Sequence, residues 1–200
     1  ERFDLEYLRQ NFDLERIGKS NARFDRTKLL AFSADALAAL SPQEFYTRLV
    51  EHLRTFHPEF IEKLDGCALR TLAEAYRQRT RVLDDPAIAG RFFVLPDDQI
   101  TFDPKAVQKV LRKNENAGLA ALREMAEVFA GADLWTPARI HELIEEQAKK
   151  TGRGMGDIAQ PLRVAVCGGT VSPPINDTLA ILGRASTIAR IRRCIEIHSA

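Results

Sequence analysis

The stretch from Gly154 to Pro174 reads GMGDIAQPLRVAVCGGTVSPP. It places one arginine, Arg163, inside an apolar run with helical spacing, and a turn of small residues, 168–170, follows that run. Ser172 and Pro173 then predict a second helix, with the serine as its cap and the proline in the first helical position. Unpaired N–H groups at a helix start and a nearby guanidinium would form a donor-rich notch, which suits phosphates or exposed base edges.

The signal of a polar cap followed by proline recurs along the chain. It is found at Ser41-Pro42, Asp85-Pro86, Asp103-Pro104 and Thr136-Pro137, each before a segment with apolar residues three or four positions apart. Strand-like alternation is confined to 91–100 and 164–166. We therefore expect an all-α fold, in which the cap at residue 41 and the turn at 96–98 separate segments 1–40, 41–95 and 96–200.

The composition is that of an ordinary globular protein, with 45% hydrophobic and 28% charged residues. The three cysteines are widely spaced and form no C-x-x-C pair, which argues against a disulfide framework or a zinc site and favours a cytoplasmic location. No apolar run is long enough for a membrane span. The four histidines match no metal-ligand pattern, so we expect no metal site and structural or surface roles for His52, His57, His141 and His198.

The net charge of +1 hides two basic regions. Residues 69–83 contain four arginines against one glutamate, and residues 151–200 contain six arginines against three acidic residues. Such regions bind nucleic acid in some proteins and are ordinary solvated helix faces in others, and the composition leaves both readings open.

The sequence contains no signature of catalysis. Gly18-Lys19-Ser20 looks like the end of a phosphate-binding loop, but Asp13 stands where that loop needs its first glycine, and no apolar strand leads into it. There is no H-x-G-H sequence and no spacing that suggests a nucleophilic triad. We therefore predict no catalytic residues and no cofactor in this chain.

Two motifs carry a resemblance to a known family. QPLRVAV and TVSPPI, in 160–175, are followed by ILGR at 181–184 and IARI at 188–191. Together they resemble the end of the anticodon-binding region of bacterial glutamyl-tRNA synthetases. FDLERIGKSNARFD at 12–25, with Lys28-Leu29, resembles the same family where its stem-contact region follows the catalytic domain. Because these motifs lie at opposite ends of the chain in the family's order, the resemblance covers nearly all of it.

The resemblance implies a short helical stem-contact segment over 1–40 and two consecutive helical anticodon-binding subdomains over 41–95 and 96–200. It implies the C-terminal part of a glutamate–tRNA ligase, a class I aminoacyl-tRNA synthetase that attaches glutamate to its tRNA with ATP and Mg²⁺. The catalytic domain would precede this chain in the same polypeptide, so we expect a monomer whose C-terminal part binds glutamate-specific tRNA but is inactive alone. The alternatives are a free-standing helical RNA-binding protein and a protein-interaction module.

The resemblance also implies functional residues. Arg77, Arg79 and Leu83 match a segment R-x-R-x-x-x-L, whose second arginine reads the third anticodon base. Unpaired cytosine offers its O2 and N3 acceptors to a guanidinium, whereas guanine would oppose it with donors.

The family further assigns anticodon contacts to Arg163, Ser172, Pro173 and Ile175, and stem contacts to Arg16 and Lys28. An internal ion pair of Arg163 with Asp157 or Asp177 is the alternative for that residue.

Two positions depart from the family: Ala31 and Ser33 stand where it usually has tryptophan and asparagine. Trp135 is expected to be a core or hinge residue rather than a platform for stacking bases.

Overall fold

The computed structural model describes residues 4–16, 18 and 24–199, and all regular structure in that part of the chain is helical. The expected all-α fold is confirmed. The α-helices are α1 (Leu5–Asn11), α2 (Arg26–Ala38), α3 (Pro42–Phe56), α4 (Pro58–Lys63), α5 (Gly66–Arg77), α6 (Asp85–Ala89), α7 (Pro104–Ala106), α8 (Lys113–Ala130), α9 (Pro137–Thr151), α10 (Met155–Cys167), α11 (Ile175–Leu182) and α12 (Arg184–His198). Among these described helices, none is both long and apolar enough to cross a membrane.

Short helical turns that are wound more tightly or more widely than an α-helix connect several of these helices. The 3-10 turns cover Leu14–Arg16, Arg91–Phe93 and Asp97–Gln99, and a π-helical turn covers Val107–Leu111. The strand-like alternation of 91–100 therefore belongs to two 3-10 turns, and that of 164–166 lies inside α10.

Local sequence explains most helix starts. At α3, the Ser41 hydroxyl accepts from the Glu44 N–H at 3.2 Å, and the Glu44 carboxylate accepts from the Ser41 N–H at 2.9 Å, which completes the predicted capping box. Asp103 and Thr136 cap α7 and α9 as predicted. The predicted start at Ser172 is wrong: α11 begins at Ile175, because two prolines in a row keep the chain extended.

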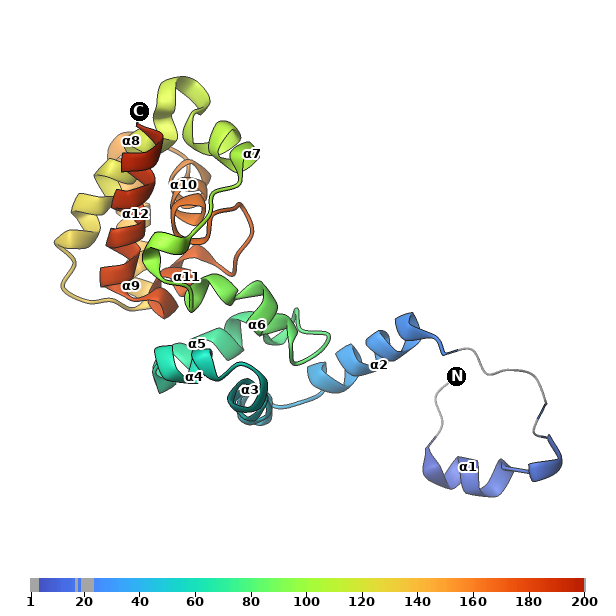
Figure 1. Cartoon of the computed structure of the whole chain (residues 1–200). Helices are drawn as coiled ribbons and strands as arrows, with labels where there is room; N and C mark the ends of the chain where they lie inside the picture. Colours follow the sequence, from blue (N-terminus) through green and yellow to red (C-terminus); the bar gives the residue numbers. More distant parts are fainter. Residues whose placement is uncertain (1–3, 17, 19–23, 200) are drawn as a thin grey trace.

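Two groups of helices form the body of the molecule (Figure 1). In the first, α3, α4 and α5 pack around side chains such as Phe45, Leu53 and Leu72, which are fully buried. In the second, α12 and α10 both pack on α8, and α9 lies beside α11. α11 also packs on α5, so the buried residues of both groups form one continuous core. The expected helical architecture after a short helical segment is confirmed, and the division between 41–95 and 96–200 stays a prediction.

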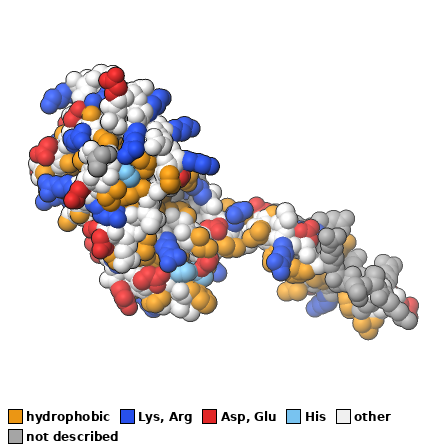
Figure 2. Space-filling view, turned by 45° about the horizontal axis from the view of Figure 1, so that its top comes forward, with side chains coloured by type: hydrophobic (Ala, Val, Ile, Leu, Met, Phe, Trp, Pro, Cys, Tyr) orange, Lys and Arg blue, Asp and Glu red, His pale blue; other side chains and the backbone are white. Residues whose placement is uncertain are grey.

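The N-terminal segment projects from this body as an arm (Figure 1). α1 has no buried residue, and Leu37 is the one buried residue of α2. Near the body, the Ser33 hydroxyl donates to the Arg81 carbonyl at 2.7 Å, so one of the two departures from the family contributes an anchor for the arm. Hydrophobic side chains are exposed along the arm (Figure 2), namely Leu5, Tyr7, Leu8, Phe12, Leu14, Phe24, Leu29, Leu30 and Phe32.

Arg190 on α12 is the largest fully buried side chain, with 1% of its surface exposed. Its Nε donates to Asp97 at 2.7 Å, and its Nη atoms donate to the carbonyls of Phe92, Val166 and Leu95 at 2.8 to 2.9 Å. Burial lowers the pKa of Arg190, and the bond to Asp97 opposes that shift, so the guanidinium stays charged. One side chain therefore joins α12 and α10 to the turns that connect the two helical groups.

Replacing Arg190 by methionine should destabilise the fold by about 3–5 kcal/mol, because Asp97 and three buried carbonyls lose their partner. Urea unfolding followed by circular dichroism measures this loss. The control is Arg192→Met on the exposed side of the same helix, which should change the free energy of unfolding by less than about 0.5 kcal/mol. Equal effects of the two substitutions would contradict the role of Arg190.

Candidate nucleic-acid interface

Tyr76 lies near the C-terminal end of α5. This side chain is buried, and burial raises its pKa to about 12. Cys167, at the end of α10, raises that pKa further, whereas Arg79 lowers it. α5 packs on α11, the helix that follows the segment after α10.

Arg77 and Arg79 have different surroundings. Arg77 is half-buried and donates to the Leu40 carbonyl at 3.2 Å, so it fixes α5 to the end of the arm. Arg79 lies in the turn beyond the last residue of α5, and its side chain is exposed. In the part of the chain that the structure describes, that side chain makes no hydrogen bond or ion pair. Its five N–H donors are therefore available to a ligand.

Arg163 holds the segment between α10 and α11. Its Nε donates to the Ser172 hydroxyl at 2.9 Å, and its Nη2 donates to the Pro173 carbonyl at 3.3 Å. No ion pair joins it to Asp157 or Asp177 among the described residues, so the alternative interpretation is wrong. Its Nη1 makes no hydrogen bond within that same set of residues and is left for a ligand.

The other predicted residues of this segment have side chains that are used within the protein. They are Ser172, Pro173 and Ile175. The Ser172 hydroxyl is also bonded to the Pro173 carbonyl at 2.9 Å and lies 3.2 Å from the Thr178 hydroxyl. Pro173 and Ile175 are buried, so their side chains pack inward. The predicted donor-rich notch at a capped helix start is not formed: the hydroxyl of Ser172 is used internally, and the Nη1 of Arg163 is the donor that these bonds leave open.

Gly168 sets the direction of the turn after α10. Its φ of +80° is in the left-handed region, and a Cβ at this position would lie 2.0 Å from the Thr101 carbonyl oxygen. Its own carbonyl accepts from the Asp103 N–H at 2.8 Å. Only glycine fits here, and the close contact fixes the segment 168–174 against the start of α7.

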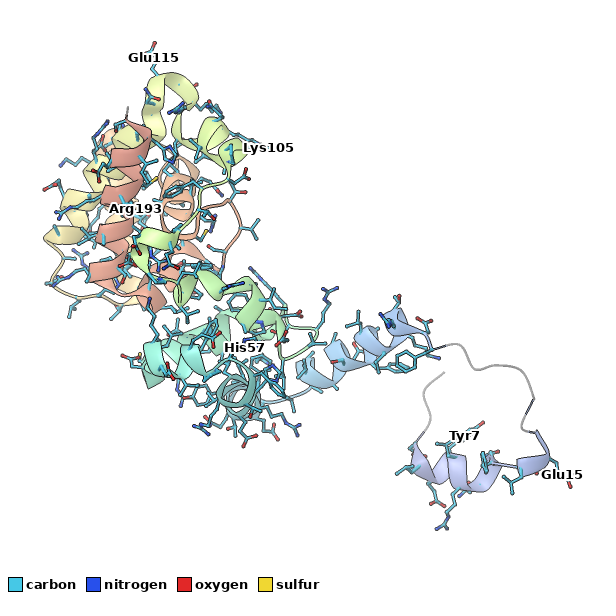
Figure 3. All side chains as sticks on the ribbon, viewed as in Figure 1. Tyr7, Glu15, His57, Lys105, Glu115 and Arg193 are labelled. Atoms are coloured by element: carbon cyan, nitrogen blue, oxygen red, sulfur yellow. The ribbon has the colours of Figure 1, made fainter. Side chains whose placement is uncertain are left out.

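A cavity of about 700 Å³ opens beside this turn. It lies between α7, the π-helical turn and the N-terminal half of α10, and it extends to Thr170. Exposed Lys105, Lys109 and Lys113 line it, together with Asp103 and Asp157 on the acidic side (Figure 3 labels Lys105). Counts of arginine do not include these lysines. Their spacing of four residues places them on one face of a helix, and this was the signal in the sequence that could have identified them.

The cavity's remaining cation, Arg153, is held in place. Its Nη1 lies 2.7 Å from the Glu124 carboxylate, which also accepts from Gln147 at 2.8 Å. The hydrogen bond from Arg153 is the main reason why the pKa of Glu124 lies below its ordinary value. This group of three side chains connects α8, α9 and the start of α10.

The predicted stem-contact residues lie on the arm. Lys28 is exposed on α2, with its ammonium 5.7 Å from the centre of the Phe32 ring. Arg16 ends the first 3-10 turn, and its side chain lies outside the described residues, as do Lys19 and Ser20 of the rejected phosphate-loop motif. Trp135 is half-buried, packs edge-on against Phe129 and donates to the Leu179 carbonyl at 2.9 Å.

Comparison with known proteins agrees with this geometry. Residues 44–195 match the family described as the anticodon binding domain. The chain is 34% identical over 97% of its length to glutamate–tRNA ligase 1 of Alkalilimnicola ehrlichii, and 32% identical over 97% to glutamate–tRNA ligase of Thermodesulfovibrio yellowstonii. It spans about two fifths of the length of these relatives, 40% and 41% respectively.

Solved structures show the same fold. A crystal structure of a glutamate tRNA ligase from Elizabethkingia meningosepticum, in complex with its amino acid, superposes with a TM-score of 0.73 at 26% identity. The superposition covers 92% of this chain and 35% of that one. Glutamate-tRNA synthetase from Elizabethkingia anophelis gives a TM-score of 0.70 at 25% identity, over 92% of this chain and 34% of that one.

Stability at acid pH should depend on Glu124. Because its pKa is lowered in the folded protein, the ionised carboxylate stabilises the fold above the unfolded value of about 4.3. That contribution is lost as the pH falls through the lower folded value. Since the pair is partly solvated, the contribution should be below about 1 kcal/mol.

We expect Glu124→Gln to lose less stability than the unmodified chain between pH 6 and pH 3, in urea unfolding at both pH values. Glu127→Gln, on an exposed position of the same helix, is the control and should behave like the unmodified chain. An unchanged acid dependence in Glu124→Gln would contradict the prediction.

Proposed function

Because this chain belongs to the anticodon-binding domain family, we propose that it is the C-terminal, tRNA-binding part of a glutamate–tRNA ligase. The observation that supports the proposal is that an exposed guanidinium at Arg79 and a half-buried one at Arg163 both keep free donors. Arg79 offers its full set of donors beyond the end of α5, and Arg163 offers its Nη1 beside Ser172. Unstacked bases present hydrogen-bonding edges to such groups, and RNA sequence is read mainly in single-stranded loops.

The chemistry of the third anticodon base favours Arg79 as the discriminating residue. A guanidinium only donates, so it can pair with O2 and N3 of cytosine. The N1–H and N2 donors of guanine would oppose it. Glutamate and glutamine anticodons differ in this way at the third base, so Arg79 would let the protein accept glutamate tRNA and reject glutamine tRNA.

The lysines of the cavity would contact the RNA backbone next to the anticodon. A cavity with several cations and few aromatic side chains suits phosphates better than stacked bases. Lys28, and Arg16 by family analogy, would contact the tRNA stem from the arm. The interface would then consist of base readers at Arg79 and Arg163, with phosphate contacts at the cavity and on the arm.

The exposed apolar side chains of the arm support a larger polypeptide. A run of exposed apolar side chains marks a surface that binds another protein surface or a further domain. We infer that the catalytic domain of the same class I enzyme covers the arm, and that ATP and Mg²⁺ bind there. In this proposal the chain contributes binding and identity, the enzyme works as a cytoplasmic monomer, and the chain alone releases no pyrophosphate from ATP.

The same apolar surface favours one rival function, a protein-interaction module that binds no RNA. RNA binding separates the two. A free-standing RNA-binding protein, the other alternative, would bind tRNA but would show no catalytic signatures encoded upstream.

Anticodon discrimination tests the proposal directly. Two anticodon stem-loops that differ only in cytosine or guanine at the third base should bind with a preference of about tenfold to hundredfold for cytosine, since an unmade buried hydrogen bond costs about 1–3 kcal/mol. Arg79→Gln can donate and accept, so it should narrow this ratio more than it weakens binding of the cytosine stem-loop. Fluorescence anisotropy with labelled stem-loops measures both constants.

Arg192→Gln serves as the control, because it removes an exposed arginine from α12 and leaves α5 intact. Equal binding of both stem-loops by the unmodified chain would refute the assignment of Arg79. Failure to bind any tRNA would refute the proposed function itself and favour the interaction module.

Salt dependence should locate the phosphate contacts. Lys109→Ala should lower the slope of log affinity against log salt by about 0.7, because one fewer phosphate loses its condensed counterions. Lys149→Ala is the control, since Lys149 is exposed but pairs with Glu145 on α9.

Lys28→Ala should lower the slope for whole tRNA and leave it unchanged for the stem-loop, and the opposite pattern would place Lys28 outside the stem contact.

A further inference from the structure

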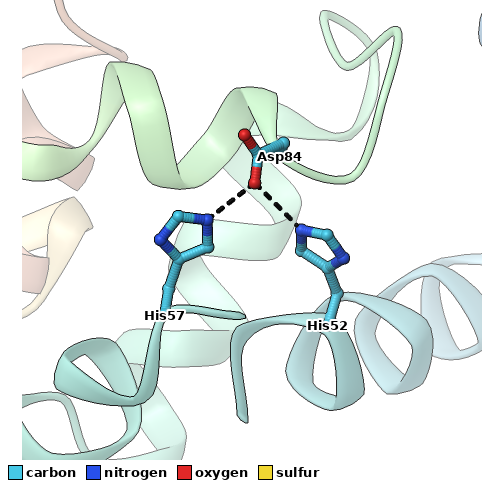
Figure 4. A group of neighbouring side chains, drawn as sticks. All are labelled: His52, His57 and Asp84. Atoms are coloured by element: carbon cyan, nitrogen blue, oxygen red, sulfur yellow. Dashed lines mark hydrogen bonds and ion pairs between the residues drawn. The ribbon is translucent and has the colours of Figure 1, made fainter. Parts of the chain in front are cut away.

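Two histidines and one aspartate converge in the first helical group (Figure 4). His52 lies near the end of α3, His57 lies between α3 and α4, and Asp84 directly precedes α6. Both Nε2 atoms contact the same carboxylate oxygen, Oδ1 of Asp84, at 3.1 Å from His52 and 2.6 Å from His57. The three atoms all lie within 4.8 Å of one another, and within the described residues this is the one such group of three or more potential ligands.

We propose that His52, His57 and Asp84 bind a zinc ion. Zinc takes imidazole nitrogen and carboxylate oxygen at about 2.0–2.2 Å, which places the ligand atoms of a tetrahedral site about 3.3 Å apart. The Nε2 atoms lie 3.1 and 2.6 Å from Oδ1 of Asp84, and the three atoms lie within 4.8 Å of one another, so the side chains must shift to reach that spacing. A borderline-soft divalent ion such as zinc suits imidazole better than Mg²⁺ or Ca²⁺ does.

A second carboxylate lies beside one of the rings. The Nδ1 of His57 lies 3.7 Å from the Glu59 carboxylate. With zinc bound at Nε2, an Nδ1 proton would face Glu59, which is the usual outer partner of a zinc-bound histidine.

The surroundings fit an open three-ligand site. The His52 and His57 side chains are 20% and 24% exposed, so a fourth position is left for water. Phe56 packs 4.8 Å from the His52 ring, and Phe60 packs edge-on against His57, which holds both rings in place. Although Asp84 occupies the position before α6, its side chain accepts no hydrogen bond from that helix, so it is free to serve as a ligand.

The segment that carries Asp84 is also rigid. The Asp85 carboxylate accepts from the backbone N–H groups of Arg81 and Val82 at 2.7 and 3.1 Å. Zinc would therefore connect α3 to a preformed turn that follows the Arg79 segment. The sequence alone did not indicate this site, because the H-x₄-H pair matches no common pattern and its third ligand lies 27 residues beyond His57.

Titration of zinc chloride into the chelator-treated chain tests the site without RNA, so its result is independent of the proposed function. We expect one zinc ion per chain, together with a rise in the unfolding temperature. His52→Ala, His57→Ala and Asp84→Asn should each weaken binding by at least about tenfold and abolish that rise. Glu59→Gln should weaken binding by about tenfold, since it removes only the outer partner.

His141→Ala is the control, because His141 is exposed on α9 and should leave zinc affinity unchanged. Far-UV circular dichroism checks that each variant is folded, and Glu59→Gln tests the site without altering a ligand. Cobalt substitution should give the intense visible absorption of a four-coordinate site. Absence of saturable zinc binding, or equal loss of affinity in His141→Ala, would overturn the proposal.

Discussion

The buried guanidinium of Arg190 is the interaction on which the relation of the two helical groups depends. A charge taken out of water is stable only when it is paired and hydrogen-bonded. The partners here are Asp97 and two carbonyls of the segment 91–99, together with the Val166 carbonyl of α10. The segment 91–99 consists of two 3-10 turns and the residues between them, and these bonds hold it against α10 and α12.

Helix positions were largely predictable from the sequence, because their signals are local. The capping box at Ser41 depends on four consecutive residues, and the structure has it as predicted. The start of α11 was not predictable in the same way. Ser172 has the right residue type for a cap, but its hydroxyl is used by Arg163, which lies nine positions earlier. A short motif cannot show that a side chain elsewhere in the sequence binds the same hydroxyl.

The basic region 151–200 shows why charge counts do not locate a binding surface. Arg184, Arg190 and Arg193 all donate to backbone carbonyls, and Arg153 pairs with Glu124, so their charges serve packing. The side chains of the lysines at 105, 109 and 113 are exposed and make no hydrogen bond or ion pair within the part of the chain that the structure describes. Arginine's forked donors suit buried carbonyls, whereas a lysine on the rim stays hydrated. The candidate site therefore combines residues that the family resemblance implied with residues that only the tertiary structure brings together.

The location of Arg79 beyond the end of α5 has an evolutionary consequence. Its side chain supports no helix, fills no space in the core and is exposed, so a substitution there costs the fold almost nothing. Arg163 is different, since its bonds to Ser172 and Pro173 hold the neighbouring segment in place. Under the role proposed for Arg79, single mutations could change the residue at position 79 while position 163 stays constrained, and changes of tRNA preference should arise first at position 79.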